Sequence, residues 1–120
     1  MNLLGIDYGK KRIGLAWVQV GLDVVLPYGI VNNIDELVTL INKEGIDKLV
    51  LGMPLGLDSK ENDNTRRVNE FAEELKKRTN LPLEFVDERF SSRQADSMGG
   101  DVSRDEKSAM VIMQTYLDKQ

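Results

Sequence analysis

The sequence has 120 residues, a formal net charge of −4, and neither cysteine nor histidine. The lack of cysteine excludes disulfides, thiolate metal sites and thiol nucleophiles, and the lack of histidine removes the commonest general base and zinc ligand. The length fits a single domain over residues 1–120, and no apolar run approaches the ~20 residues of a membrane span, so we expect a cytoplasmic protein without a membrane segment.

The first third of the chain is predicted to form three strands joined by short turns. Residues 3–7 form a short apolar strand that ends in the carboxylate of Asp7, and residues 12–18 form a second strand after a tight glycine turn. Gly14 lies inside the second strand, where a glycine often marks a bulge or a close backbone approach. A third strand, residues 23–31, contains a proline, which lacks a backbone donor and therefore indicates an edge strand.

After residue 31 the pattern alternates between helices and strands. Asn33 is a candidate N-cap, with Glu36 three residues later, for a helix that Gly45 ends. The order βββαβαβα predicts an α/β fold, in which right-handed crossovers add parallel strands to the first three. We therefore expect a mixed five-stranded sheet with helices packed on it. The remaining predicted elements are a strand over 46–51, a helix over 63–78, a strand over 83–86 and a helix that opens at Ser103.

Three acidic residues fall at the ends of predicted elements. Asp7 ends the first strand, Glu88 follows the strand over residues 83–86, and Asp105 lies in the first turn of the last helix, on the face predicted to contact the sheet. Ligands of α/β sheets gather at the carboxyl ends of parallel strands, so Asp7 and Glu88 are expected at one edge. Converging carboxylates repel one another unless they share a cation, and oxygen ligands suit Mg²⁺ or Mn²⁺. The pattern predicts a metal site suited to phosphodiester cleavage.

Each of these acids also has a simpler explanation. Asp7 could cap the hairpin turn, Glu88 could be a solvated loop residue, and Asp105 could favour the positive end of the helix dipole. No single position decides between the explanations. The joint pattern favours a metal site because the predicted fold brings the three positions together.

Basic residues flank the predicted acidic edge and are candidates for contacts with the phosphates of a nucleic acid. Arg67 is the ambiguous member, because an arginine on a solvated helix face is common. The candidates are Lys11, Arg12, Arg67, Arg89 and Arg93.

Several of these segments resemble those of the YqgF/RuvX family, in order and from end to end. The similar segments are Leu4-Gly5-Ile6-Asp7-Tyr8-Gly9, Leu51-Gly52-Met53-Pro54-Leu55, Asp87-Glu88-Arg89-Phe90-Ser91-Ser92 and Asp105-x-x-Ser108-Ala109. The resemblance implies a ribonuclease H-like fold with Asp7, Glu88 and Asp105 as the active-site acids. A fourth acid, one helical turn after Asp105, would fall at Ser108, so the number of metal ions stays open.

The resemblance also implies an activity. It indicates a metal-dependent nuclease, a hydrolase of phosphodiester bonds, that matures the 5′ end of the 16S rRNA precursor during ribosome biogenesis. Some members of the family have instead been viewed as Holliday-junction resolvases. The expected partner is thus a structured rRNA precursor or branched DNA, and a homodimer is left open.

A non-catalytic binding module is the alternative from another class. An Asp-x-Gly turn between antiparallel strands is also similar to the phosphate-binding loop of actin-like ATPases. Those enzymes bind nucleotide between two such domains, and 120 residues supply only one. The acids Glu88 and Asp105 discriminate between the two classes, because a scaffold does not need them.

Overall fold

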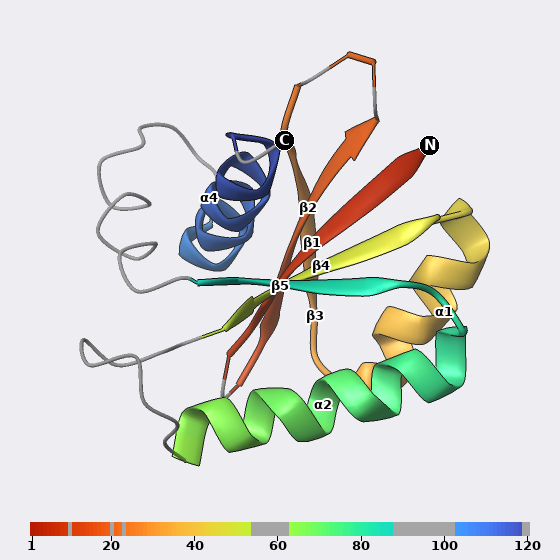
Figure 1. The fold of residues 1–120 in the computed structure, drawn as a ribbon, viewed down its shortest axis with the longest axis vertical. Coiled ribbons are helices and arrows are strands. Elements are labelled where there is room, and N and C mark those ends of the chain that lie inside the picture. The colour runs from red at the N-terminus through yellow and green to blue at the C-terminus, as the bar shows by residue number, and fades with distance from the viewer. Residues whose placement is uncertain (10, 20, 23, 54–62, 88–102, 119–120) are drawn as a thin grey trace.

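A mixed five-stranded sheet forms the centre of the molecule, with helices on both of its faces (Figure 1). The computed structural model describes residues 1–9, 11–19, 21–22, 24–53, 63–87 and 103–118. The strands are β1 (Asn2–Tyr8), β2 (Ile13–Gln19), β3 (Leu26–Val31), β4 (Lys48–Met53) and β5 (Leu83–Asp87). The helices within the described ranges are α1 (Ile34–Glu44), α2 (Asp63–Thr79) and α4 (Arg104–Asp118).

The strands lie in the spatial order β3-β2-β1-β4-β5. The first three strands are antiparallel neighbours, whereas β4 runs parallel to β1 and β5 runs parallel to β4. The predicted order βββαβαβα and the mixed sheet are confirmed. β3 forms one edge of this sheet, as its proline indicated. Strands β1, β4 and β5 end at a common edge, where ligands of α/β sheets gather.

β3 is shorter than the sequence pattern indicated. The strand was predicted from residue 23, but it begins at Leu26. Val24 and Val25 are β-branched and favour extended backbone. Pairing with β2, however, begins only where Leu26 lies opposite Trp17, so the two valines lack a strand partner.

The helix ends follow the capping signals in the sequence. The Oδ1 atom of Asn33 accepts a hydrogen bond of 2.9 Å from the backbone N–H of Glu36 at the start of α1. Gly45 ends this helix in the left-handed conformation, with φ of 64°. Ser103 caps α4, since its Oγ atom accepts from the N–H of Glu106 at 3.2 Å. None of the helices described here is long and apolar enough to cross a membrane.

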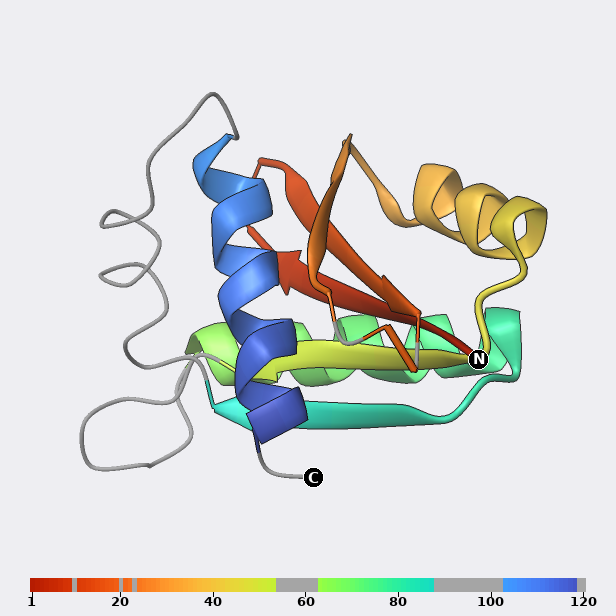
Figure 2. The same cartoon turned by 90° about the horizontal axis from the view of Figure 1, so that it is seen from above.

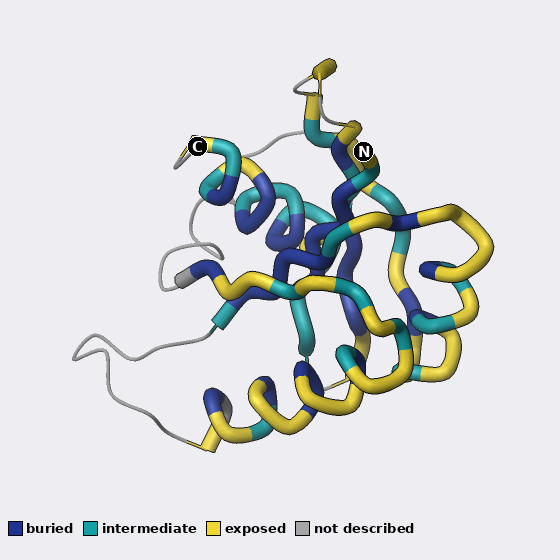
Figure 3. The backbone as a smooth tube through the Cα atoms, turned by 45° about the vertical axis from the view of Figure 1, so that its right-hand side comes forward, coloured by how far each residue is buried: buried dark blue, intermediate teal, exposed yellow. Residues whose placement is uncertain are grey.

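Two hydrophobic layers hold the helices on the sheet. Alternate residues of β1 point to opposite faces: Leu4 and Ile6 pack with α1 and α2, while Leu3 packs with α4. Figure 2 shows α4 on one side of the sheet and α1 with α2 on the other. The inner faces of the helices and the central strands are buried (Figure 3). Burial of each large apolar side chain contributes about 1.5–3 kcal/mol, so packing, and not helix propensity, fixes where α4 lies.

Polar contacts at both ends fix how α4 lies across the sheet. Near its start, Glu106 accepts a 2.7 Å hydrogen bond from the backbone N–H of Gly29 in β3. Near its end, Lys48 of β4 donates to the Tyr116 hydroxyl at 2.8 Å and to Glu84 of β5 at 3.1 Å. The hydrogen bond with Tyr116, followed by that with Glu84, raises the pKa of Lys48. These contacts tie α4 directly to β3 and β4, and through Lys48 to β5, and they hold its first turn at the edge where β1 ends.

Candidate active site

Asp7 lies on the face of the sheet that α4 covers. It pairs with Gly14 of β2, and partners in an antiparallel register point to the same face. Two residues earlier on β1, Gly5 lies in close contact with α4, because a β-carbon at this glycine would lie 3.2 Å from the carbonyl oxygen of Ala109. Strand alternation therefore directs the half-buried side chain of Asp7 toward the first turn of α4.

Gly14 brings Asp105 next to Asp7. A β-carbon at Gly14 would collide with the backbone carbonyl of Asp105 and would lie 2.9 Å from its Cβ atom. The first turn of α4 therefore rests directly on the backbone of β2, opposite Asp7. The sequence indicated a bulge or a close approach at this glycine. The structure shows a register shift between Gly14 and Ala16 and identifies Asp105 as the close neighbour. The expectation that Asp105 faces the sheet is confirmed.

On the α4 face of β2, the residues become smaller toward this edge of the sheet. Val18, opposite Leu3, is followed by Ala16 opposite Gly5 and then by Gly14 opposite Asp7. This taper lets the helix approach the sheet most closely at its first turn. The small residues thus have a positional role, because they set the depth at which Asp105 lies beside Asp7.

Glu88 lies outside the described residues, and so do Arg89 and Arg93. Glu88 follows directly after Asp87, the last residue of β5, which pairs with Met53 of β4. Within the described part of the chain, no three acidic side chains gather closely enough to hold a metal ion. The structure brings two of the three predicted acids together, and the place of the third stays a prediction.

Arg12 neutralises part of the acidic charge at this edge. Its Nε atom lies 3.2 Å from the Oδ2 atom of Asp105, and the two side chains are 58% and 27% exposed. The turn before Arg12 is closed by a hydrogen bond of 3.0 Å from the N–H of Gly9 to the carbonyl of Arg12. The neighbouring side chain of Lys11 is exposed. Arg12 therefore lies beside Asp105, and the exposed Lys11 precedes it in the same turn.

The ion pair of Arg12 is expected to add little to stability. Arg12→Gln should lower the free energy of unfolding by less than about 1 kcal/mol, because exposed ion pairs are screened by water and salt. Urea denaturation at low and high salt measures this effect. A loss above about 2 kcal/mol would mean that the pair is structural rather than available to a ligand.

Arg67 lies on the opposite side of β1 from Asp7. Its guanidinium is centred 5.2 Å from the ring of Tyr8, and that ring stacks on Phe71 with centroids 4.1 Å apart and planes at 13°. Arg67 lines a pocket of about 580 Å³ together with Lys11 and Arg12. The pocket brings together the three predicted basic residues that the structure describes.

Sequence reasoning missed most of the residues that build this pocket. Neither Phe71 nor Tyr8 is among the site residues that the sequence predicts. The available signal was strand alternation, because a residue next to Asp7 must point to the other face of the sheet. Asn32 also lines the pocket, just before α1.

Comparison with known proteins gives consistent matches over almost the whole chain. The model of the RuvX family, described as Holliday junction resolvase, matches residues 1–119. A protein of Dictyoglomus turgidum named "Putative pre-16S rRNA nuclease" is 35% identical, over 98% of this chain and 94% of the relative. A protein of the same name from Maridesulfovibrio salexigens is 33% identical, over 98% of both chains.

Solved structures show the same fold. Thermus thermophilus RuvC in complex with a Holliday junction superposes with a TM-score of 0.69 at 13% identity, over 98% of this chain and 93% of that one. A second structure of Thermus thermophilus RuvC gives a TM-score of 0.64 at 10% identity, over 99% and 96% of the two chains. These matches confirm the ribonuclease H-like fold. By its family model and its relatives, the chain belongs to the RuvX family of nucleases.

Proposed function

We propose that this protein is a metal-dependent nuclease that processes the 5′ end of precursor 16S rRNA in the cytoplasm. The observation that carries the proposal is that Gly14, the strand partner of Asp7, is in close contact with Asp105. This contact joins two carboxylates at the edge where the parallel strands end. Two relatives, 35% and 33% identical, carry the name of a pre-16S rRNA nuclease.

The residues of this edge fit a divalent cation. Two carboxylates offer the hard oxygen ligands that Mg²⁺ and Mn²⁺ prefer, and Arg12 forms an ion pair with Asp105 beside them. Asp7 and Asp105 would hold the ion, with Glu88 as a third ligand beyond the end of β5. When bound, such a cation supplies Lewis-acid stabilisation of charge on a phosphate.

The cations of the chain would position the substrate. Lys11 and Arg12 extend from the turn beside the carboxylates, where a phosphate backbone can meet them. Arg89 and Arg93 are proposed to add contacts from the segment after β5. Hydrolysis then adds water across one phosphodiester bond, which leaves a phosphate on one product and a hydroxyl on the other.

A parallel cleavage assay tests this function. A labelled precursor 16S rRNA fragment and a four-way DNA junction are incubated with the protein in Mg²⁺, in Mn²⁺ and in EDTA. We expect cleavage of the RNA with either metal and none in EDTA, because the carboxylates alone cannot stabilise a phosphate charge. Cleavage in EDTA would reject metal dependence, and cleavage of neither substrate would favour the binding module.

Resolution of a four-way DNA junction is the second candidate function. The family description and the RuvC complex support it. Because resolution needs two symmetric cuts, this function requires two active sites and hence a homodimer, whereas one cut in RNA needs one site. Cutting of the junction alone, by a protein that is dimeric in light scattering, would replace the rRNA proposal.

A further inference from the structure

The pocket that contains Arg67 differs in charge from the rest of the molecule. Among the described residues that line it are three cations, Lys11, Arg12 and Arg67, and two acids, Glu70 and Glu74. The whole chain carries a net charge of −4, so the net charge of the residues that line the pocket is opposite in sign to that of the chain. A local cationic surface on an acidic protein indicates an anionic ligand.

The wall of the pocket has the chemistry of a base-stacking site. Tyr8 and Phe71 form a rigid aromatic pair, and Arg67 is held against the ring of Tyr8. Proteins bind unpaired nucleotides by combining aromatic or guanidinium planes with cations that contact the phosphate. Asn32 adds an amide, which can both donate to and accept from the edge of a base.

The size of the pocket favours a single nucleotide. Its volume of about 580 Å³ lies in the range of small-ligand sites and is far too small for a duplex. The residues that line it come from three regions of the sequence: the β1–β2 turn with the adjoining strand ends, the start of α1 and the middle of α2. A base that enters must therefore be unpaired.

Arg12 connects the pocket to the acidic edge. It lines the pocket, and its Nε atom lies 3.2 Å from Asp105. A nucleic-acid chain with one phosphate at the acidic edge can therefore place a neighbouring nucleotide in the pocket by passing over Arg12. The two sites lie on opposite faces of β1 but share this side chain.

We propose that the pocket is a subsite for one unpaired nucleotide adjacent to the bond that is cut. The inference rests on the proposed nuclease function and narrows its substrate, because the RNA must carry a single-stranded nucleotide beside the cleavage site. The guanidinium of Arg67 stacks on the base, and Lys11 and Arg12 contact its phosphates.

Binding in EDTA tests the subsite without cleavage. Two fluorescent RNA hairpins are titrated by anisotropy, one with a short single-stranded tail and one blunt. The wild type should bind the tailed hairpin more tightly. Arg67→Gln should weaken binding of the tailed hairpin by about tenfold, which is the loss typical of one base stack, and should change binding of the blunt hairpin less than about twofold.

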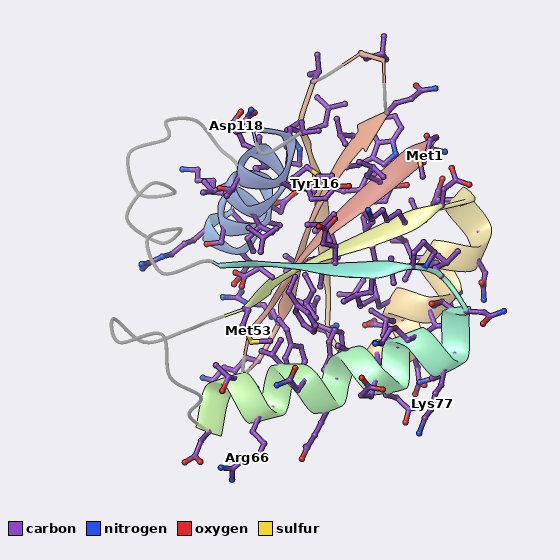
Figure 4. All side chains as sticks on the ribbon, viewed as in Figure 1. Met1, Met53, Arg66, Lys77, Tyr116 and Asp118 are labelled. Atoms are coloured by element: carbon purple, nitrogen blue, oxygen red, sulfur yellow. The ribbon has the colours of Figure 1, made fainter. Side chains whose placement is uncertain are left out.

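Arg66→Gln is the matched control on the same helix. Arg66 points away from the sheet (Figure 4), is not among the residues that line the pocket, and lies 3.7 Å from Asp63. Its replacement removes the same charge and should change both affinities less than about twofold, since distant charges are screened by salt. Circular dichroism confirms that both variants fold.

Several outcomes would overturn the subsite. These are equal binding of the two hairpins by the wild type, no effect of Arg67→Gln, or a loss that is equal on both hairpins or equal for both arginine variants. A protein that binds the tail through Arg67 but cleaves neither RNA nor DNA would uphold the subsite and reject the nuclease function.

Discussion

Asp7→Asn is expected to lower the rate of metal-dependent cleavage at least about 100-fold, because loss of even an outer-shell partner costs about 10–100-fold in metal affinity or activity. The amide has the shape of the carboxylate but neither its charge nor its strength as a metal ligand. Asp7 is half-buried on β1 and opposite Gly14, so the substitution leaves the packing unchanged. Initial rates over a Mn²⁺ titration, with Mn²⁺ affinity measured by calorimetry, test both the activity and the site.

Asp118→Asn serves as the control for this substitution. Asp118 is exposed at the far end of α4, where it accepts a hydrogen bond of 3.0 Å from Gln114 (Figure 4). This variant should cleave and bind Mn²⁺ like the wild type, while Asp105→Asn should lose activity as Asp7→Asn does. Wild-type cleavage by Asp7→Asn would remove this aspartate from the site.

Gly14→Ala is expected to have the largest effect on stability. The new methyl group would meet the backbone carbonyl of Asp105, and a helix backbone cannot turn aside as a side chain can. Overpacking of this kind costs about 1–3 kcal/mol, and a displacement of about 1 Å at a reacting group can cost about 100-fold in rate. We therefore expect a lower free energy of unfolding in urea and a large loss of cleavage together.

Gly5→Ala is the matched comparison at the same interface. Its β-carbon would lie 3.2 Å from atoms of Ala109 and Met113, so small shifts of a few tenths of an ångström accommodate it. The loss of stability should be below that of Gly14→Ala, and Asp105 should keep its place. If the two alanine variants are equally active, the close approach at Gly14 does not position the site.

Local patterns in the sequence predicted the elements and their caps. Asn33, Gly45 and Ser103 act at helix ends through contacts within a few residues, so their roles are visible without a fold. Strand direction also predicted Asp7 at a sheet edge, and helical periodicity predicted Asp105 on the helix face toward the sheet. These properties depend on neighbouring residues alone.

Contacts between distant segments were not predictable in the same way. A glycine in a strand signals that something comes close, but only the folded structure identifies Asp105 as the neighbour of Gly14. The stack of Tyr8 on Phe71 joins β1 to α2, and no local pattern in the sequence predicts this contact. The sequence around Arg67 is typical of a solvated helix face, whereas in the structure the guanidinium of Arg67 lies over the ring of Tyr8.

The late position of α4 in the chain has a consequence for protein synthesis. Chains fold as they emerge from the ribosome, beginning at the N-terminus. Until α4 is made, Leu3, Val18, Val50 and Val86 lack the helix that covers them, and this apolar sheet face is open to aggregation. Asp7 is synthesised early, but Asp105 comes to lie near it only when α4 packs on the sheet. Under the proposed function, an unfinished chain therefore lacks one of the acids of the site and is expected to be inactive.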